Sequence, residues 1–264
     1  MTHLHTPYSF SAFNSISQAV HLGVEQGVRV LGINDFFTTK GYEEWAITCK
    51  SKDVFPLFNI EFIGLSKPDQ KHNIRINDPS NPGRIYLSGK GLSFPFTLEH
   101  SLVDKFNHLT IDSNHHTEKL CSKLNEYLEQ TGVDIYLDFN SILKSHTKGM
   151  VRERHLAKVL HEEIVKLSKN QEEKTALLNK ILRTDKAVQF PDNAAFIENE
   201  IRNSLLKAGG AAYIPEAEDS FLSVEKVKEF ILKGGGIPTY PYWLMIRTES
   251  LQNLRLKKMF WLKN

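Results

Sequence analysis

The region between residues 15 and 65 alternates between helical and strand patterns, and this alternation restricts the fold more than any other feature. Residues 15–27 place apolar side chains one helical turn apart, and residues 28–33 form a short apolar run typical of a buried strand. A second helical pattern over 42–50 and a second strand pattern over 56–65 repeat the order. Helices and strands that alternate at this spacing predict an α/β fold built on a parallel sheet or barrel.

The pattern changes after residue 96, where strand signals nearly disappear. The clearest amphipathic helical stretches are 118–128, 154–167 and 193–206. We therefore expect residues 1–96 to form the first part of the α/β core and residues 97–209 to form a helical insertion. The core resumes over 210–241, with a predicted helix at 224–233 and a short strand at 237–240.

Composition excludes several classes of protein. The chain has 33 Lys and Arg against 31 Asp and Glu, and this net charge of +2 predicts no binding surface for duplex nucleic acid. Its two cysteines are too few for a disulfide framework or a cysteine-based zinc site, so we expect a reducing, cytoplasmic location. No apolar run reaches the roughly 18 residues that a membrane span needs. The first residues, which include two histidines, do not match a signal peptide.

Four residues form a candidate metal site. His3 and His5 are two positions apart, so on an extended segment both imidazoles point to the same side. Asp35 follows the first predicted strand, and Glu61 interrupts the second. Nitrogen and carboxylate ligands of this kind suit zinc, manganese or iron. The pair of histidines can also be coincidental and Asp35 can be a cap or turn residue, whereas burying a lone glutamate is costly.

Several segments together resemble the PHP (polymerase and histidinol phosphatase) domain family. Residues 2–9 (THLHTPYS) are similar to its opening motif, residues 32–35 (GIND) to its second and residues 59–61 (NIE) to its third. Residues 154–160 (RHLAKVL) resemble a helix of its phosphoesterase branch, and residues 235–241 (GGIPTYP) lie where that branch has a Gly-Gly strand ending in His-Pro. The resemblance extends over nearly the whole chain up to residue 241.

This resemblance implies a distorted (β/α)7 barrel with a helical insertion. It also implies hydrolysis of a phosphate ester, in a nucleotide or a small phosphomonoester, by a metal-activated hydroxide. The implied ligands of a divalent ion (Mn, Fe, Zn or Mg) are His3, His5, Asp35 and Glu61. Arg154 and His155 would face the substrate phosphate, although the same pair can equally be an ordinary solvated helix face.

The sequence also departs from the family pattern. Phe36 stands where the second motif has histidine, Tyr240 stands in place of the later histidine, and the closing Asp-x-His motif is absent. We therefore expect fewer than three ions. A competing interpretation is a degenerate, non-catalytic PHP-like binding module or an inactive truncated remnant. A polymerase-associated module is a weaker third interpretation because the chain carries no polymerase segment. The substrate and the oligomeric state remain open.

Both ends of the chain differ from the family pattern. Residues 242–264 lack Gly, Ala, Val and Asp but contain two of the three tryptophans. We interpret this tail as either a C-terminal helix or a frameshifted reading of the gene. Only two residues precede His3, where family members have a strand. The expected barrel is therefore incomplete at both ends and exposes open sheet edges.

Overall fold

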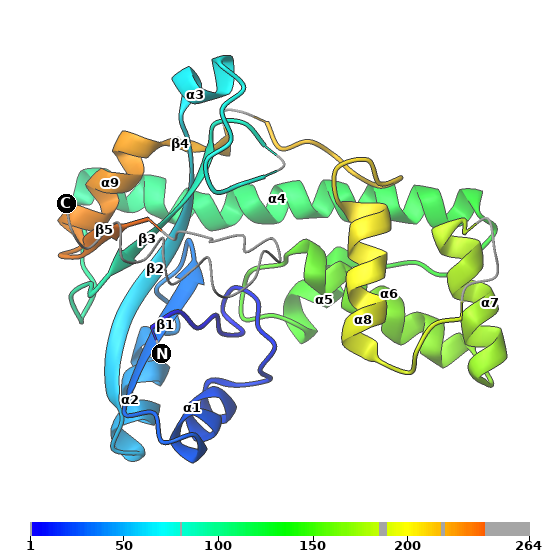
Figure 1. The fold of residues 1–264 in the computed structure, drawn as a ribbon, viewed down its shortest axis with the longest axis horizontal. Coiled ribbons are helices and arrows are strands. Elements are labelled where there is room, and N and C mark those ends of the chain that lie inside the picture. Colours follow the sequence, from blue (N-terminus) through cyan, green and yellow to red (C-terminus); the bar gives the residue numbers. More distant parts are fainter. Residues whose placement is uncertain (1, 80, 185–188, 218–219, 241–264) are drawn as a thin grey trace, which may run out of the picture.

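A computed structural model of the chain describes residues 2–79, 81–184, 189–217 and 220–240 (Figure 1). These residues form a curved sheet with helices packed against it at one end of the molecule and a helical part at the other end. Helix α4 (His100–Gln130) runs through both parts and connects them (Figure 1). The predicted tail at 242–264 lies outside the described residues.

The sheet is mixed and open. Its strands are β1 (Val30–Phe36), β2 (Phe55–Leu65), β3 (Arg84–Lys90), β4 (Leu222–Ser223) and β5 (Ile237–Thr239). The order is β1-β2-β3-β5, and β4 pairs with β2. The predicted α/β class is confirmed, and β1 and β2 are parallel, but β3 is antiparallel to both β2 and β5.

The antiparallel β3 corrects the expectation of a parallel barrel. Between β2 and β3 the chain forms only the short helix α3 (Lys67–Lys71), which does not cross the sheet to return in the parallel direction. The strands of the described ranges therefore form an open mixed sheet, which differs in strand direction from the incomplete (β/α)7 barrel that the sequence predicts.

The N-terminal segment around Leu4 runs parallel to β1, along the edge of β1 that does not pair with β2. Leu4 forms a bridge with Ile33; its N–H donates to the Gly32 carbonyl at 3.0 Å, and its carbonyl accepts from Asn34 at 2.7 Å. This edge of β1 is consequently covered, in contrast to the open edge that the sequence predicts. The pairing also places His3 and His5 beside the strand.

Two helices cover the start of the sheet. Helix α1 (Ile16–Glu25) begins where the Ser15 hydroxyl accepts a hydrogen bond from the Gln18 N–H, as the sequence predicts. Helix α2 (Tyr42–Ser51) packs against β1 and β2. The buried apolar side chains that join them to the sheet include Ile16, Val20, Leu31, Ile33, Trp45 and Cys49.

Helix α4 belongs to two hydrophobic cores. Phe106, near its start, packs with Phe62 of β2 and Phe230 of α9 (Val224–Lys233). Its later turns bury Leu124 and Leu128 in the helical part. The sequence predicts only 118–128 as helix, because the polar residues before it have weak helix propensity. Packing at both ends stabilises the longer helix, which begins close to the predicted boundary at residue 97.

The helical part has its own core. It contains α5 (Phe139–Ser145), α6 (Glu153–Leu167), α7 (Gln171–Leu182), α8 (Ala194–Ile201) and a π-helical turn over Arg202–Leu206. The predicted helices at 154–167 and 193–206 are confirmed in position, whereas α5 and α7 are additions. Within the described ranges, no helix combines the length and apolar character that crossing a membrane requires.

Candidate metal centre

One face of the sheet carries most of the polar side chains near the N-terminal segment. Asn34 of β1 pairs in register with Asn59 of β2, Phe36 pairs with Glu61, and Glu61 pairs with Ser88 of β3. Residues opposite each other on neighbouring strands point to the same face. We call the face that carries Asn34, Phe36, Asn59, Glu61, Ser88 and Lys90 the polar face.

His3, His5 and Glu61 converge at this face. The Glu61 Oε2 atom lies 3.4 Å from His3 Nε2 and 3.2 Å from His5 Nε2. The Glu61 side chain is only 6% exposed, whereas that of His3 is 40% exposed, so the cluster is open to solvent on the histidine side. Among the described residues, these three form a group of potential metal ligands with all ligand atoms within 4.8 Å of one another.

The geometry and chemistry of the cluster fit a divalent cation. Ligand atoms about 2.1 Å from an ion in tetrahedral geometry lie about 3.4 Å apart, close to the separations found here. Two imidazoles and one carboxylate leave further coordination positions for water or substrate. His5 Nδ1 is buried without a hydrogen-bond partner in the described structure, so His5 contacts polar groups only through Nε2.

The charge state of Glu61 suits cation binding. Burial by itself raises the pKa of Glu61, but the hydrogen bonds and charges of His3 and His5 outweigh burial and lower the pKa below its usual value. Glu61 is therefore ionised at neutral pH. A buried carboxylate needs a positive partner, and the two imidazole nitrogens are placed to share a cation with it.

The structure does not bring Asp35 into this cluster. Asp35 pairs with Ile60, the residue before Glu61, and therefore points to the opposite face of the sheet. Its carboxylate accepts hydrogen bonds from the Thr6 N–H (2.6 Å), the Thr6 hydroxyl (2.5 Å) and the Ser9 hydroxyl (2.6 Å). Burial raises the pKa of Asp35 to about 6, although these bonds oppose the shift. These hydrogen bonds attach the loop that follows His5 to strand β1.

Aromatic rings surround His5 on the polar face. The His5 ring stacks on Phe10 at 4.6 Å between centroids and on Phe36 at 5.0 Å. Phe36 pairs in register with Glu61, so its side chain stands where a further ligand from β1 would have to stand. The position that departs from the PHP pattern therefore packs against a candidate ligand and supplies no donor atom of its own.

The structure separates the roles of Arg154 and His155. His155 Nδ1 accepts a hydrogen bond from the Arg152 backbone N–H at 2.9 Å and so caps the start of α6. Burial, followed by the nearby Arg152 charge, lowers the pKa of His155 to about 4. The Arg154 guanidinium lies 5.4 Å from the ring centre of Phe10, which itself stacks on His5. Arg154 is thus next to the candidate metal centre.

Arg152 is a site residue that the sequence interpretation missed. Its guanidinium lies 5.3 Å from the ring centre of Phe36 and donates to the Ser113 hydroxyl at 3.2 Å. The half-buried Glu153 carboxylate lies 3.8 Å from Arg152 Nε and 3.0 Å from the Arg202 guanidinium, and it holds both cations in place. The Arg-x-Arg spacing at the start of a predicted helix was the only sequence signal for a second guanidinium at this position.

The capping role of His155 predicts a pH-dependent stability. Because the folded pKa lies below the usual value of 6.5, the contribution of His155 is present above pH 6.5 and is lost as the pH falls towards 4. Replacing His155 with glutamine, which can cap the helix without titrating, should remove about 2 kcal/mol of the pH dependence of unfolding between pH 7 and 4. Urea unfolding of both proteins across this range measures the difference, and identical pH profiles would contradict the assignment.

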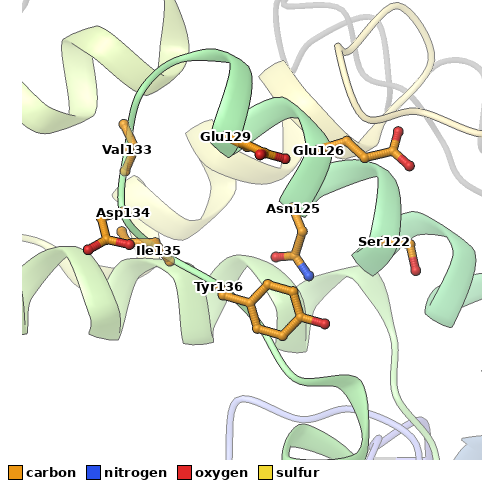
Figure 2. Close-up of a pocket in the computed structure, with 8 residues that line it drawn as sticks. All are labelled: Ser122, Asn125, Glu126, Glu129, Val133, Asp134, Ile135 and Tyr136. Atoms are coloured by element: carbon orange, nitrogen blue, oxygen red, sulfur yellow. The ribbon is translucent and has the colours of Figure 1, made fainter.

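A groove lies away from the metal cluster. It encloses about 500 Å³ beside the end of α4 and the connection to α5, and Figure 2 shows the side chains that line it. Three of them, Glu126, Glu129 and Asp134, are acidic, and Tyr136 lies across its lower part (Figure 2). None of the predicted site residues lines this groove.

Comparison with solved structures identifies the fold. No protein-family model and no curated protein sequence matches the chain. An amidohydrolase from Chromobacterium violaceum, solved with bound sulfate and no metal, is 14% identical with a TM-score of 0.60, over 99% of this chain and 72% of that chain. A candidate metal-dependent phosphoesterase from Bifidobacterium adolescentis is 15% identical with a TM-score of 0.57, over 98% and 72%. The chain therefore has the same fold as this amidohydrolase and this candidate phosphoesterase.

Proposed function

We propose that the chain is a metal-dependent phosphoesterase of PHP type that hydrolyses a phosphate ester in a nucleotide or small phosphomonoester. The convergence of His3, His5 and Glu61 beside two arginines carries this proposal. A cation next to fixed guanidinium groups suits a substrate with several negatively charged oxygens. The structural similarity to a candidate metal-dependent phosphoesterase supports the same reaction class.

Each part of the site has a distinct role in this proposal. His3, His5 and Glu61 hold the divalent ion, which supplies Lewis-acid activation of water and neutralises phosphate charge. Arg154 orients the phosphate through charge-assisted hydrogen bonds, and Arg152 adds a second positive charge. His155 keeps the start of α6 in place and contacts no substrate. Phe10 and Phe36 exclude water around His5.

We propose that the site holds a single ion. Phe36 supplies no ligand on the polar face, and Asp35 points away from it. The described residues thus offer one group of three ligands. A Mn, Fe, Zn or Mg ion is compatible with this set, and its mixed nitrogen and oxygen donors favour the first three.

Metal analysis combined with a phosphatase assay tests the function. The purified full chain should contain close to one Mn, Fe or Zn per molecule and should release phosphate from p-nitrophenyl phosphate or nucleoside monophosphates. His5→Ala should lose both the metal and the activity, whereas His21→Ala should keep both, because the His21 side chain is 60% exposed and its Nε2 lies 3.4 Å from Glu25 Oε1. A metal-free protein without turnover, even after incubation with these ions, would contradict the proposal.

The absence of a donor at Phe36 supports one alternative function. A degenerate PHP-like module would bind a phosphorylated ligand without hydrolysing it, and a truncated remnant would do neither. Stoichiometric metal without turnover, together with binding of a nucleotide in calorimetry, would identify the binding module.

Arg154 gives the proposal a kinetic test. Arg154 is an exposed residue whose guanidinium lies over the Phe10 ring, so it can contact the substrate. Replacing Arg154 with glutamine should raise KM for a phosphomonoester about 10-fold or more, because hydrogen bonds to charged groups contribute about 1.5–3 kcal/mol. Arg29→Gln, at an exposed position of the connection before β1, is the control. An unchanged KM for Arg154→Gln would exclude Arg154 from phosphate binding.

A further inference from the structure

Glu153, in the first turn of α6, lies at the centre of a cluster of cationic side chains. Its Oε1 atom accepts hydrogen bonds from Arg202 Nε at 3.2 Å and Arg202 Nη2 at 3.0 Å, and it lies 3.5 Å from Lys207 Nζ. Its Oε2 atom lies 3.8 Å from Arg152 Nε. Burial by itself raises the pKa of Glu153, but the charges of Arg152, Lys207 and Arg202 lower this pKa well below its usual range. One ionised carboxylate therefore faces three cations in the described structure.

A π-helical turn brings two of these cations to the same oxygen atom. The turn spans Arg202–Leu206, and the Lys207 N–H donates to the Arg202 carbonyl at 3.0 Å. In a regular α-helix, with about 100° per residue, side chains five positions apart point about 140° away from each other. Here the side chains of Arg202 and Lys207 both reach Glu153 Oε1. The wider turn therefore lets one carboxylate oxygen bind both cations.

Arg152, in contrast, makes no hydrogen bond to Glu153. The 3.8 Å between Arg152 Nε and Glu153 Oε2 is too long for one. An arginine side chain has five N–H groups, and among the described residues the Ser113 hydroxyl accepts from one of them, at 3.2 Å. The guanidinium also lies 5.3 Å from the ring centre of Phe36. Ser113 and Phe36 thus hold Arg152 independently of Glu153, and most of its donors remain available for an anion.

These donors lie beside the candidate metal centre. The Phe36 ring contacts the Arg152 guanidinium, and the Phe10 ring contacts the Arg154 guanidinium. Both rings stack on His5, and their centres are 5.8 Å apart. Two guanidinium groups over neighbouring rings suit the oxygens of a phosphate group, because planar charged donors bind phosphate strongly.

We propose that Arg202 and Lys207 are positioning residues that bind Glu153 and thereby keep the Arg152 guanidinium available for a phosphate group of the substrate. Without them, the Glu153 carboxylate would turn to Arg152 and compete with that phosphate. The role rests on the proposed function, but the contact between Arg152 and Glu153 is a property of the metal-free protein without substrate. Neither Arg202 nor Lys207 needs to touch the substrate for this role.

Nitrogen-15 NMR of the arginine Nε–H groups in the metal-free full chain tests the proposal, with Arg152→Lys used to assign the Arg152 signal. Arg202→Met should shift this signal and slow the exchange of its proton with water, because Arg152 then donates to Glu153. Inorganic phosphate, titrated against the same signal, should bind about 10-fold more weakly than to the wild type, as expected when a hydrogen bond to a charged group is lost. Arg202→Lys keeps the charge and should leave both properties close to those of the wild type.

A double variant separates this role from a general effect on folding. Glu153→Gln combined with Arg202→Met removes the competing charge together with its partner, so the Arg152 signal and the phosphate affinity should return towards the wild type. A purely structural role predicts the opposite, because the double variant loses more contacts than Arg202→Met alone.

Lys207 gives a second, milder variant. Its side chain is 46% exposed, so Lys207→Met decides the question even if Arg202→Met does not fold. It should shift the Arg152 signal in the same direction and weaken phosphate binding about 3-fold, in keeping with a partly exposed ion pair. Lys119→Met, at an exposed position of α4, is the control and should change neither measurement.

Three results would overturn the proposal: an Arg152 signal that Arg202→Met leaves unchanged, a double variant that binds phosphate no better than Arg202→Met, or a wild-type protein in which phosphate does not move the Arg152 signal. Failure of the proposed function would look different. In that case the wild-type protein would bind no divalent metal and hydrolyse no phosphate ester, while the Arg152 signal would still depend on Arg202 and Glu153.

Discussion

Replacing Glu61 with glutamine is expected to weaken divalent-metal binding by at least about 100-fold, because losing a group that only orients a ligand already costs about 10- to 100-fold. Glu61 is the carboxylate that both histidines face, and glutamine keeps its size but removes its charge. The amide would also offer donors towards His3 and His5, where a cation needs acceptors. Phosphoesterase activity should fall with the metal.

Calorimetry with Mn²⁺ and Zn²⁺ measures this loss directly, and thermal unfolding gives an independent readout. At a metal concentration of 100 Kd, the wild-type protein should gain about 2.7 kcal/mol of stability that Glu61→Gln does not gain. Glu99→Gln is the matched control, because Glu99 is exposed and pairs with Lys233. Equal metal affinity in wild type and Glu61→Gln would place the ion elsewhere in the protein.

Replacing Asp35 with leucine is expected to lower the free energy of unfolding by about 3–5 kcal/mol, because each buried polar group left without a partner costs about 1–3 kcal/mol. Leucine has a similar volume but cannot accept a hydrogen bond. The buried Thr6 N–H, the Thr6 hydroxyl and the Ser9 hydroxyl would lose their acceptor. Total stabilities are about 5–15 kcal/mol, so this loss can prevent folding at 37 °C.

Urea unfolding of the metal-free proteins checks this expectation. Asp104→Leu, at an exposed position of α4, should have little effect and is the control. Asp35→Asn keeps one acceptor oxygen and should lie between leucine and the wild type. If Asp35→Leu loses metal binding without losing stability, Asp35 is a ligand, as the sequence pattern suggests, and its hydrogen bonds to Thr6 and Ser9 are secondary.

Local patterns predicted those parts of the fold that depend on near neighbours in the chain. The Ser15 cap, the helix at 154–167 and the strand at 56–65 are encoded by hydrophobic periodicity and capping within a few residues. The spacing of His3 and His5 likewise predicted that their imidazoles face the same way.

The misassignments have specific physical causes. Asp35 and Glu61 both lie on buried strands, but side chains alternate between faces, and the register places Asp35 opposite Ile60. The antiparallel direction of β3 depends on the connection over residues 66–83, whose described part forms only the short helix α3 and no helix that crosses the sheet. The first turns of α4 have weak intrinsic helix propensity and are stabilised by packing at both ends.

The residue types of the candidate site can be recognised without a structure: two imidazoles two residues apart, and a carboxylate in a strand that would otherwise be apolar. The neighbours of these residues, in contrast, depend on how the strands pair and where the chain returns. Strand register turned Asp35 away and placed Phe36 beside His5, and the chain path brought Arg152 and Lys90 to the same face. Side-chain types and short periodicities are local properties, whereas contacts between residues 30 to 150 positions apart depend on topology, which no local pattern specifies.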